Sequence, residues 1–177
     1  MLVVGSVGPG LARADEDTSR FSAPAALSAQ EGYLDLEGAG VHKEAVEALA
    51  AEGVFLGTEC APQRFCPDEP LSRRDMAIWL LRLLDTASPT RPDSVRFVDV
   101  PVDLLWAPHV ERLAEWDVTR GCAMEPGAHC CPDHPVTRAE TAAFLFRAVG
   151  LPRAESAGFA DTAGHFFRHQ IDALGDC

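Results

Sequence analysis

Apolar residues recur at the spacing of an α-helix in the stretch that starts near residue 43. Charged residues occupy the opposite side, so the pattern predicts a helix with one face on a core. The apolar positions of this face are Ala45, Val46, Leu49 and Ala50. Gly53 follows and is predicted to cap the C-terminus, because glycine enters the left-handed conformation freely. The same spacing returns at Val110, Leu113 and Ala114, with Asp117 in place of the glycine.

Two further helices are predicted to start after Ser72 and Thr137. Thr137 and Glu140 have the spacing of a capping box, in which each side chain bonds the other residue's amide. Ser72 and Asp75 have the same layout, and a proline stands two residues before each cap. The predicted core positions of these helices are Ile78, Trp79 and Leu81, and Ala139, Ala142, Ala143, Leu145, Phe146 and Val149.

These elements belong to an internal repeat. Residues 131–148, CPDHPVTRAETAAFLFRA, match residues 66–83, CPDEPLSRRDMAIWLLRL, at eight of eighteen positions. The match extends upstream, where 97–122 aligns with 33–60, and a third copy begins at 159. We therefore expect unit one at 33–85, unit two at 97–149 and the start of unit three at 159–177. The joints are 86–96 and 150–158, rich in proline, serine and glycine, and 15–32 is an N-terminal linker.

The units are predicted to be helix-loop-helix repeats in an all-α fold. A unit of about 50 residues with two helices buries too little surface to fold alone, so the units must pack on each other. Unit three stops at Cys177 inside an expected helix, and we interpret the sequence as truncated there.

Residues 1–14 resemble a truncated secretory signal peptide. Ala12-Arg13-Ala14 follows an apolar run like a cleavage site, although a basic start is missing, and an unstructured tail is the alternative. No stretch approaches the roughly 18 apolar residues of a membrane span, so no membrane insertion is expected. The formal net charge of −12 argues against nucleic acid as a partner. Common catalytic motifs are lacking, so we predict neither an enzyme nor a cofactor.

The repeated phrases resemble the S-layer homology repeat over residues 33–177. The residues that carry the resemblance are F-V-D-V at 97–100, V-T-R-A-E-T-A-A-F-L-F-R-A at 136–148, and the third opening F-A-D at 159–161. The resemblance implies a pseudo-threefold helical bundle, incomplete here. It also implies a secreted protein of the bacterial cell wall or surface, anchored noncovalently to secondary polysaccharide through an anionic, pyruvate-bearing amino sugar.

The resemblance places ligand contacts at the early aspartate, the aromatic position and the arginine of the T-R-A-E phrase. The expected groove combines Asp99, Trp106 and Arg138. Glu140, Asp35 and Arg73 are the further expected ligand residues. Arg138 opens a helix, where a guanidinium and free amides both favour an anion. The alternative is that Arg138 and Arg73 pair with nearby acids.

Unit one departs from the family pattern, because it has His42 at the aromatic position and Arg74-Asp75 for Ala-Glu. We therefore expect unit one to be mainly structural. The residue of unit three at the aromatic position is Phe167.

Five of the six cysteines cluster around the interhelix loops, and the sixth, Cys177, has no predicted partner. Alignment of the units predicts one disulfide in each loop, Cys60 with Cys66 and Cys122 with Cys131, as export permits. Cys130 is either a buried free thiol or a competitor for Cys122. A zinc site is the alternative, and its ligands would be Cys122, His129, Cys130, Cys131 and His134. Its spacing lacks the usual zinc knuckles, so no metal is expected.

Two other functions fit the same sequence. The repeats would be the wall-targeting part of a larger exported hydrolase, or a protein-protein assembly module that self-associates and binds no glycan.

Overall fold

The computed structural model describes residues 32–85, 89–154 and 157–175. The predicted signal peptide (1–14) and Cys177 lie outside these residues. The elements are a 3-10 helix η1 (Leu36–His42) and the α-helices α1 (Lys43–Ala51), α2 (Arg73–Leu84), α3 (Ala107–Glu115), α4 (Arg138–Val149) and α5 (Arg168–Gly175). The described residues contain isolated β-bridges but no strand, so the predicted all-α class is confirmed.

The helix ends follow the predicted local signals. Ser72 and Thr137 are the N-caps of α2 and α4, and their side chains accept the amides of Asp75 and Glu140. Thr137 and Glu140 complete a reciprocal capping box. Gly53 follows α1 with a φ of 74°.

Asp117 takes the corresponding position after α3 with a φ of 58°. An aspartate thus adopts the left-handed conformation that glycine adopts in unit one. Aspartate tolerates this conformation better than most residues, because its short side chain bonds locally. Here the carboxylate pairs with Arg120.

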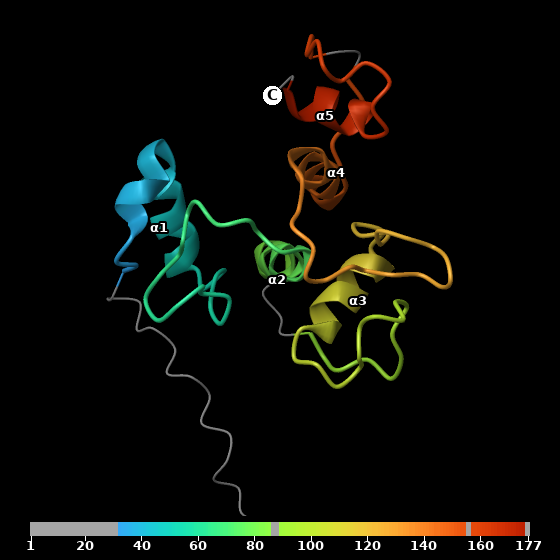
Figure 1. The fold of residues 1–177 in the computed structure, drawn as a ribbon, viewed down its shortest axis with the longest axis horizontal. Helices are drawn as coiled ribbons and strands as arrows, with labels where there is room; N and C mark the ends of the chain where they lie inside the picture. Colours follow the sequence, from blue (N-terminus) through green and yellow to red (C-terminus); the bar gives the residue numbers. More distant parts are fainter. Residues whose placement is uncertain (1–31, 86–88, 155–156, 176–177) are drawn as a thin grey trace, which may run out of the picture.

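The second helices of units one and two lie at the centre of the molecule. In Figure 1, α2 and α4 are seen nearly along their axes, and α1, α3 and α5 lie around them. Each central helix packs against the first helix of the next unit, α2 against α3 and α4 against α5. The two helices of each pair therefore come from consecutive sequence units and not from the same unit.

Two apolar clusters form the core. The larger joins α2, α3 and α4 with the start of unit two, and its largest fully buried side chains are Phe97, Leu81, Leu113, Val100 and Val110. The smaller belongs to unit one and contains Leu36, Ala39, Val46, Val54 and Phe55, with Trp79 packed against it.

The structure corrects two predicted core positions and adds a third that was not predicted. Val149 is 60% exposed and Ala45 is also exposed, whereas Phe144, which was not predicted, is buried. Packing against α2 and α3 decides which side of α4 is buried, and the sequence pattern within α4 does not contain this information.

Main-chain hydrogen bonds connect units one and two where they pack against each other. The amides of Arg73 and Arg74 open α2, and they donate to the carbonyls of His134 and Pro132 over 2.9 Å each. In return, the amide of Val136 donates to the carbonyl of Leu71 over 2.8 Å. The first turn of a helix leaves its amides unpaired, so unit two completes the N-terminus of α2.

Asp35 and Asp99 hold the two interhelix loops in the same way. Both carboxylate oxygens of Asp35 accept backbone amides, from Phe65 at 2.9 Å and Cys66 at 2.8 Å. Asp99 accepts the amides of Cys130 and Cys131 over 2.8 Å each. Each aspartate thus joins the start of its unit to the end of its loop.

The Asp35 clamp predicts a dependence of stability on pH. Burial works to raise the pKa of Asp35, but the amides of Phe65 and Cys66 outweigh it and hold the pKa below its ordinary value of 3.8. The stabilising contribution is therefore complete above the ordinary pKa and is lost as the pH falls through the lower folded pKa. Asp35→Asn should lower the melting temperature at neutral pH and flatten its decline in acid, in thermal melts followed by circular dichroism. Glu47→Gln, at an exposed site on α1, should keep the wild-type pH profile. An Asp35→Asn profile as steep as wild type would contradict this assignment.

The structure contains the disulfides Cys60–Cys66 and Cys122–Cys131, as predicted. Cys130 is a free thiol, 3% exposed in the larger cluster. Burial raises its pKa to about 11 against the opposing effect of Arg73, which leaves the thiol protonated and unreactive. The cysteines of the alternative zinc site are therefore divided between a disulfide and the core.

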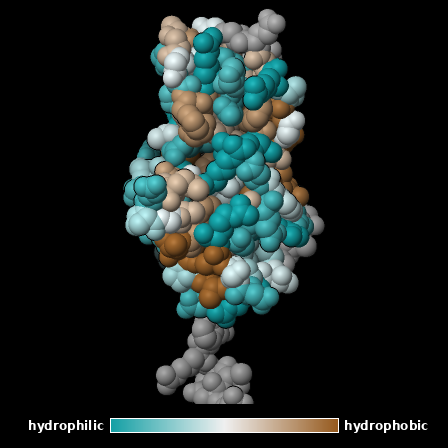
Figure 2. Space-filling model, turned by 90° about the vertical axis from the view of Figure 1, so that its right-hand side faces the viewer, coloured by the Kyte–Doolittle hydropathy of each residue, from teal (hydrophilic) through white to brown (hydrophobic). Residues whose placement is uncertain are grey.

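The surface carries both hydrophilic and hydrophobic residues. On the face shown in Figure 2, hydrophilic residues are interspersed with separate apolar patches. None of the helices in the described residues has the length and apolar content needed to cross a membrane.

Candidate functional site

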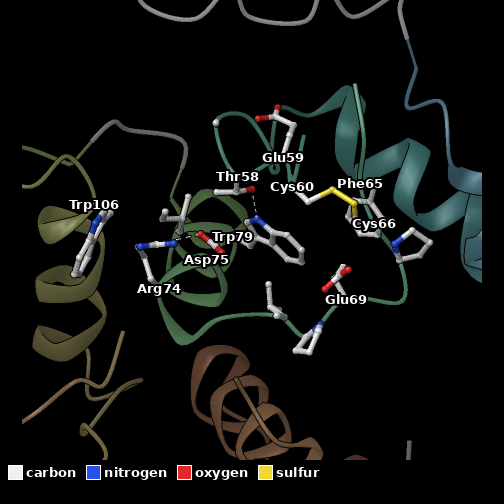
Figure 3. A pocket seen from close by; sticks show the side chains of 15 residues that line it. Thr58, Glu59, Cys60, Phe65, Cys66, Glu69, Arg74, Asp75, Trp79 and Trp106 are labelled. Atoms are coloured by element: carbon white, nitrogen blue, oxygen red, sulfur yellow. Dashed lines mark hydrogen bonds and ion pairs between the residues drawn. A yellow bond between two sulfur atoms is a disulfide. The ribbon is translucent and has the colours of Figure 1, made fainter. Parts of the chain in front are cut away.

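An open groove of about 550 Å³ lies where unit one meets the first helix of unit two. Figure 3 shows its side chains: the loop of unit one forms one wall, α2 forms the floor, and Trp106 closes the far end. The Cys60–Cys66 disulfide is part of the loop wall. We call this space the first groove.

Two tryptophans line the first groove. Trp79 rises from α2, and its indole nitrogen donates to the hydroxyl of Thr58 over 2.7 Å. Phe55 meets its ring edge-on with centroids 4.6 Å apart, which fixes the indole against the core of unit one. Trp106 is the residue before α3, and it is half-buried. The indole of Trp79 is therefore held in place, and Trp106 packs partly against the larger cluster.

Arg74 is the basic residue of the first groove. Its guanidinium lies over the ring of Trp106, 5.9 Å from the centroid. It also pairs with Asp133 at 3.0 Å and with Asp75 at 3.5 Å. The positive charge of Arg74 is thus already balanced within the protein.

The carboxylates of Glu59 and Glu69 also line the first groove. Neither carboxylate makes a hydrogen bond or ion pair with another residue of the described chain. With Asp75 and Arg74 the lining holds three negative charges and one positive charge. The first groove is therefore acidic.

Arg73 and Glu140 form a buried tie between the units instead of lining a groove. Arg73 is 5% exposed, its Nε donates to the carbonyl of Cys130 over 2.7 Å, and its Nη1 pairs with Glu140 at 2.7 Å. The guanidinium also lies over the ring of Phe144, 5.3 Å from its centroid. The alternative interpretation, pairing with a nearby acid, thus describes Arg73, and its predicted ligand contact stays a prediction.

Arg138 lines a second groove, of about 450 Å³, between α4 and the start of unit three. Arg138 is exposed, and its guanidinium has no hydrogen bond or ion pair to any described residue. Asp161 and His165 lie on the opposite wall.

The structure does not bring the three residues of the expected groove together. Trp106 lines the first groove, Arg138 lines the second, and Asp99 holds the loop of its own unit. His42, Trp106 and Phe167, the residues at the predicted aromatic position, each immediately precede the first α-helix of their unit.

Sequence reasoning missed Arg74, Trp79, Glu59 and Glu69 as groove residues. Trp79 was assigned to the core, and unit one was expected to be mainly structural. One signal was present, because Arg74-Asp75 departs from the Ala-Glu of the family pattern. These two residues belong to α2 and bring a charged pair to the floor of the first groove.

The chain was compared with known protein families, with curated proteins and with solved structures, and none of them matches it.

Proposed function

We propose that this protein anchors an exported protein noncovalently to an anionic secondary polysaccharide of a bacterial cell wall. The observation that carries the proposal is the unpaired guanidinium of Arg138 in an open groove. A planar guanidinium binds a carboxylate with two parallel hydrogen bonds, which suits a pyruvate-bearing sugar.

The start of α4 adds to the attraction for an anion. Arg138 is the first residue of this 12-residue helix. The amides of Arg138 and Ala139 donate to no described residue, whereas the equivalent amides of α2 are bound by unit two. Free amides and the helix dipole both favour negative charge at this end.

The shared architecture of the units supports an assignment to tandem S-layer homology repeats. Both units have a capped second helix, an aspartate that binds two loop amides, and a disulfide in the loop. Disulfides are typical of proteins that leave the cytoplasm, which agrees with a place at the cell wall.

Co-sedimentation with purified cell-wall sacculi tests the proposal. The protein should sediment with native sacculi and should stay in solution after chemical removal of the secondary polysaccharide. Arg138→Ala should weaken binding by about tenfold or more, since a hydrogen bond to a charged group contributes roughly 1.5 to 3 kcal/mol.

Arg153→Ala is the matched control, because it removes the same charge from another exposed position. Arg153 lines neither groove. It should bind as wild type does. Failure of the native protein to sediment with native sacculi would contradict the proposal, and so would equal losses in the two variants.

A second candidate function is assembly with other protein chains. Val41, Leu105 and Phe166 are 94%, 88% and 85% exposed, and each lies one residue before the aromatic position of its unit. Exposed apolar residues at a repeated position favour protein contacts. This candidate predicts that Arg138→Ala changes self-association, measured by sedimentation velocity, and leaves sacculus binding unchanged.

A further inference from the structure

We propose that the first groove binds a sugar that carries a free, protonated amino group. This inference rests on the proposed function and names the ligand chemistry of a groove that faces the same polymer. The ligand class is a cationic glycan residue, in contrast to the anionic group assigned to Arg138.

The charges of the first groove favour a cation. The carboxylates of Glu59 and Glu69 make no hydrogen bond or ion pair with a described residue, and Arg82 interacts with Glu59 only as a nearby charge. The one guanidinium in the lining, that of Arg74, is paired with Asp75 and Asp133. An incoming carboxylate would have to displace these partners and would meet two further carboxylates. An ammonium group gains a favourable interaction with the same residues and displaces nothing.

The aromatic lining favours a sugar over a simple cation. Trp79 and Trp106 stand on α2 and at the start of α3, with the groove between them (Figure 3). Indole rings pack well against the apolar faces of sugar rings, and their faces also attract an ammonium group. The hydroxyl of Thr58 donates to the carbonyl of Phe55 and accepts from Trp79, so its second lone pair can accept a hydrogen bond from a sugar hydroxyl.

The volume of the groove agrees with an oligosaccharide. About 550 Å³ lies within the range of sites that hold small molecules, and the open side allows a chain to continue beyond the groove. A polymer that fills both grooves would therefore carry amines and acids along the same chain. That is a zwitterionic polysaccharide.

Titration with two matched oligosaccharides tests the inference. The probes are a glucosamine tetramer and an N-acetylglucosamine tetramer, which differ only in the acetyl groups that remove the charge. Binding is followed by fluorescence of the tryptophans in the full chain. The glucosamine tetramer should bind roughly fivefold or more tightly than its acetylated counterpart, and the difference should shrink at high salt.

Variants then identify the carboxylates responsible. The double variant Glu59→Gln with Glu69→Gln should lose the preference for the amine and retain the wild-type circular dichroism spectrum. Glu44→Gln with Glu47→Gln is the control, because it changes the net charge equally at exposed sites on α1 that do not line the groove. This control should keep the preference.

Three results would overturn the inference: equal affinity for the two tetramers, tighter binding of the acetylated one, or an equal loss in both double variants. Tetralysine binding as tightly as the glucosamine tetramer would also overturn it, since the groove would then select charge without a sugar. These outcomes are separable from failure of the proposed function. Native protein that sediments with sacculi while showing no amine preference contradicts the inference alone.

Discussion

Replacement of Gly121 by alanine should lower the free energy of unfolding by about 4 kcal/mol. Gly121 has a φ of 84°, where an L-residue is strained by roughly 1 to 3 kcal/mol. A Cβ atom at this position would also press on the carbonyl oxygen of His129 and would lie 2.8 Å from the ring of Phe97. Relief of such overpacking typically costs a further 1 to 3 kcal/mol, roughly.

The surroundings of Gly121 have little freedom to move away. The carbonyl of His129 accepts the amide of Cys122 over 2.7 Å, and the Cys122–Cys131 disulfide closes the loop around it. Phe97 is 1% exposed in the larger cluster. The alanine methyl must therefore distort either the loop or the core.

Gly57→Ala provides a matched control for Gly121→Ala. Gly57 occupies the same place in unit one with a φ of 74°, but an added Cβ would meet no atom within 4 Å. It should cost only the backbone strain, about 1 to 3 kcal/mol. Urea denaturation followed by circular dichroism compares the two. Equal losses would show that the contacts of Gly121 contribute nothing.

Arg73→Ala is expected to destabilise the protein by about 3 to 5 kcal/mol, the range for breaking a buried ion pair. The substitution removes the hydrogen bond to Cys130, the ion pair with Glu140 and the contact with the ring of Phe144. Glu140 keeps its capping bonds to Thr137 but loses its partner for the other oxygen. The same denaturation experiment measures the loss.

Arg74→Ala is the control for Arg73→Ala, because it removes the same charge from a less buried position. The Arg74 side chain is 36% exposed and pairs with the exposed Asp133, so Arg74→Ala should cost less than about 1 kcal/mol. Arg73→Ala and Glu140→Gln should also be non-additive, because the two side chains share one interaction. A loss for Arg73→Ala no larger than that for Arg74→Ala would contradict the buried tie.

Features set by neighbours in the sequence could be predicted. The caps Ser72 and Thr137 are recognised because a helix start needs only residues within one turn. The disulfides were predicted because each closes a short loop between aligned positions. Gly53 was recognised for the same reason, since its conformation depends on the helix it ends.

Features set by the rotation of one unit against the next could not be predicted. Arg73 and Arg74 are adjacent in sequence, yet the packing of unit two buries the first and leaves the second in a groove. Trp106 and Arg138 belong to the same unit and face different neighbours. A repeat pattern gives the period of the chain and contains no information on the angle between copies.

The overall charge was equally uninformative about the grooves. A net charge of −12 describes the whole chain, whereas among the described residues Arg138 has no ion-pair partner in one groove, and Glu59 and Glu69 have none in the other. Only the positions of these side chains reveal the local charge of each groove.

The main-chain hydrogen bonds between units one and two affect how the chain unfolds. Since α2 receives its N-terminal partners from 132–134 and shares its core with α3, it is coupled more closely to unit two than to α1. We therefore expect α2 to unfold together with unit two, so that the cooperative unit spans the boundary between the two sequence repeats. Unfolding of α1 should leave the larger cluster of α2, α3 and α4 folded. Unfolding of the loop at 130–136 should instead destabilise both α2 and α4, because this loop binds the start of α2 and leads into α4.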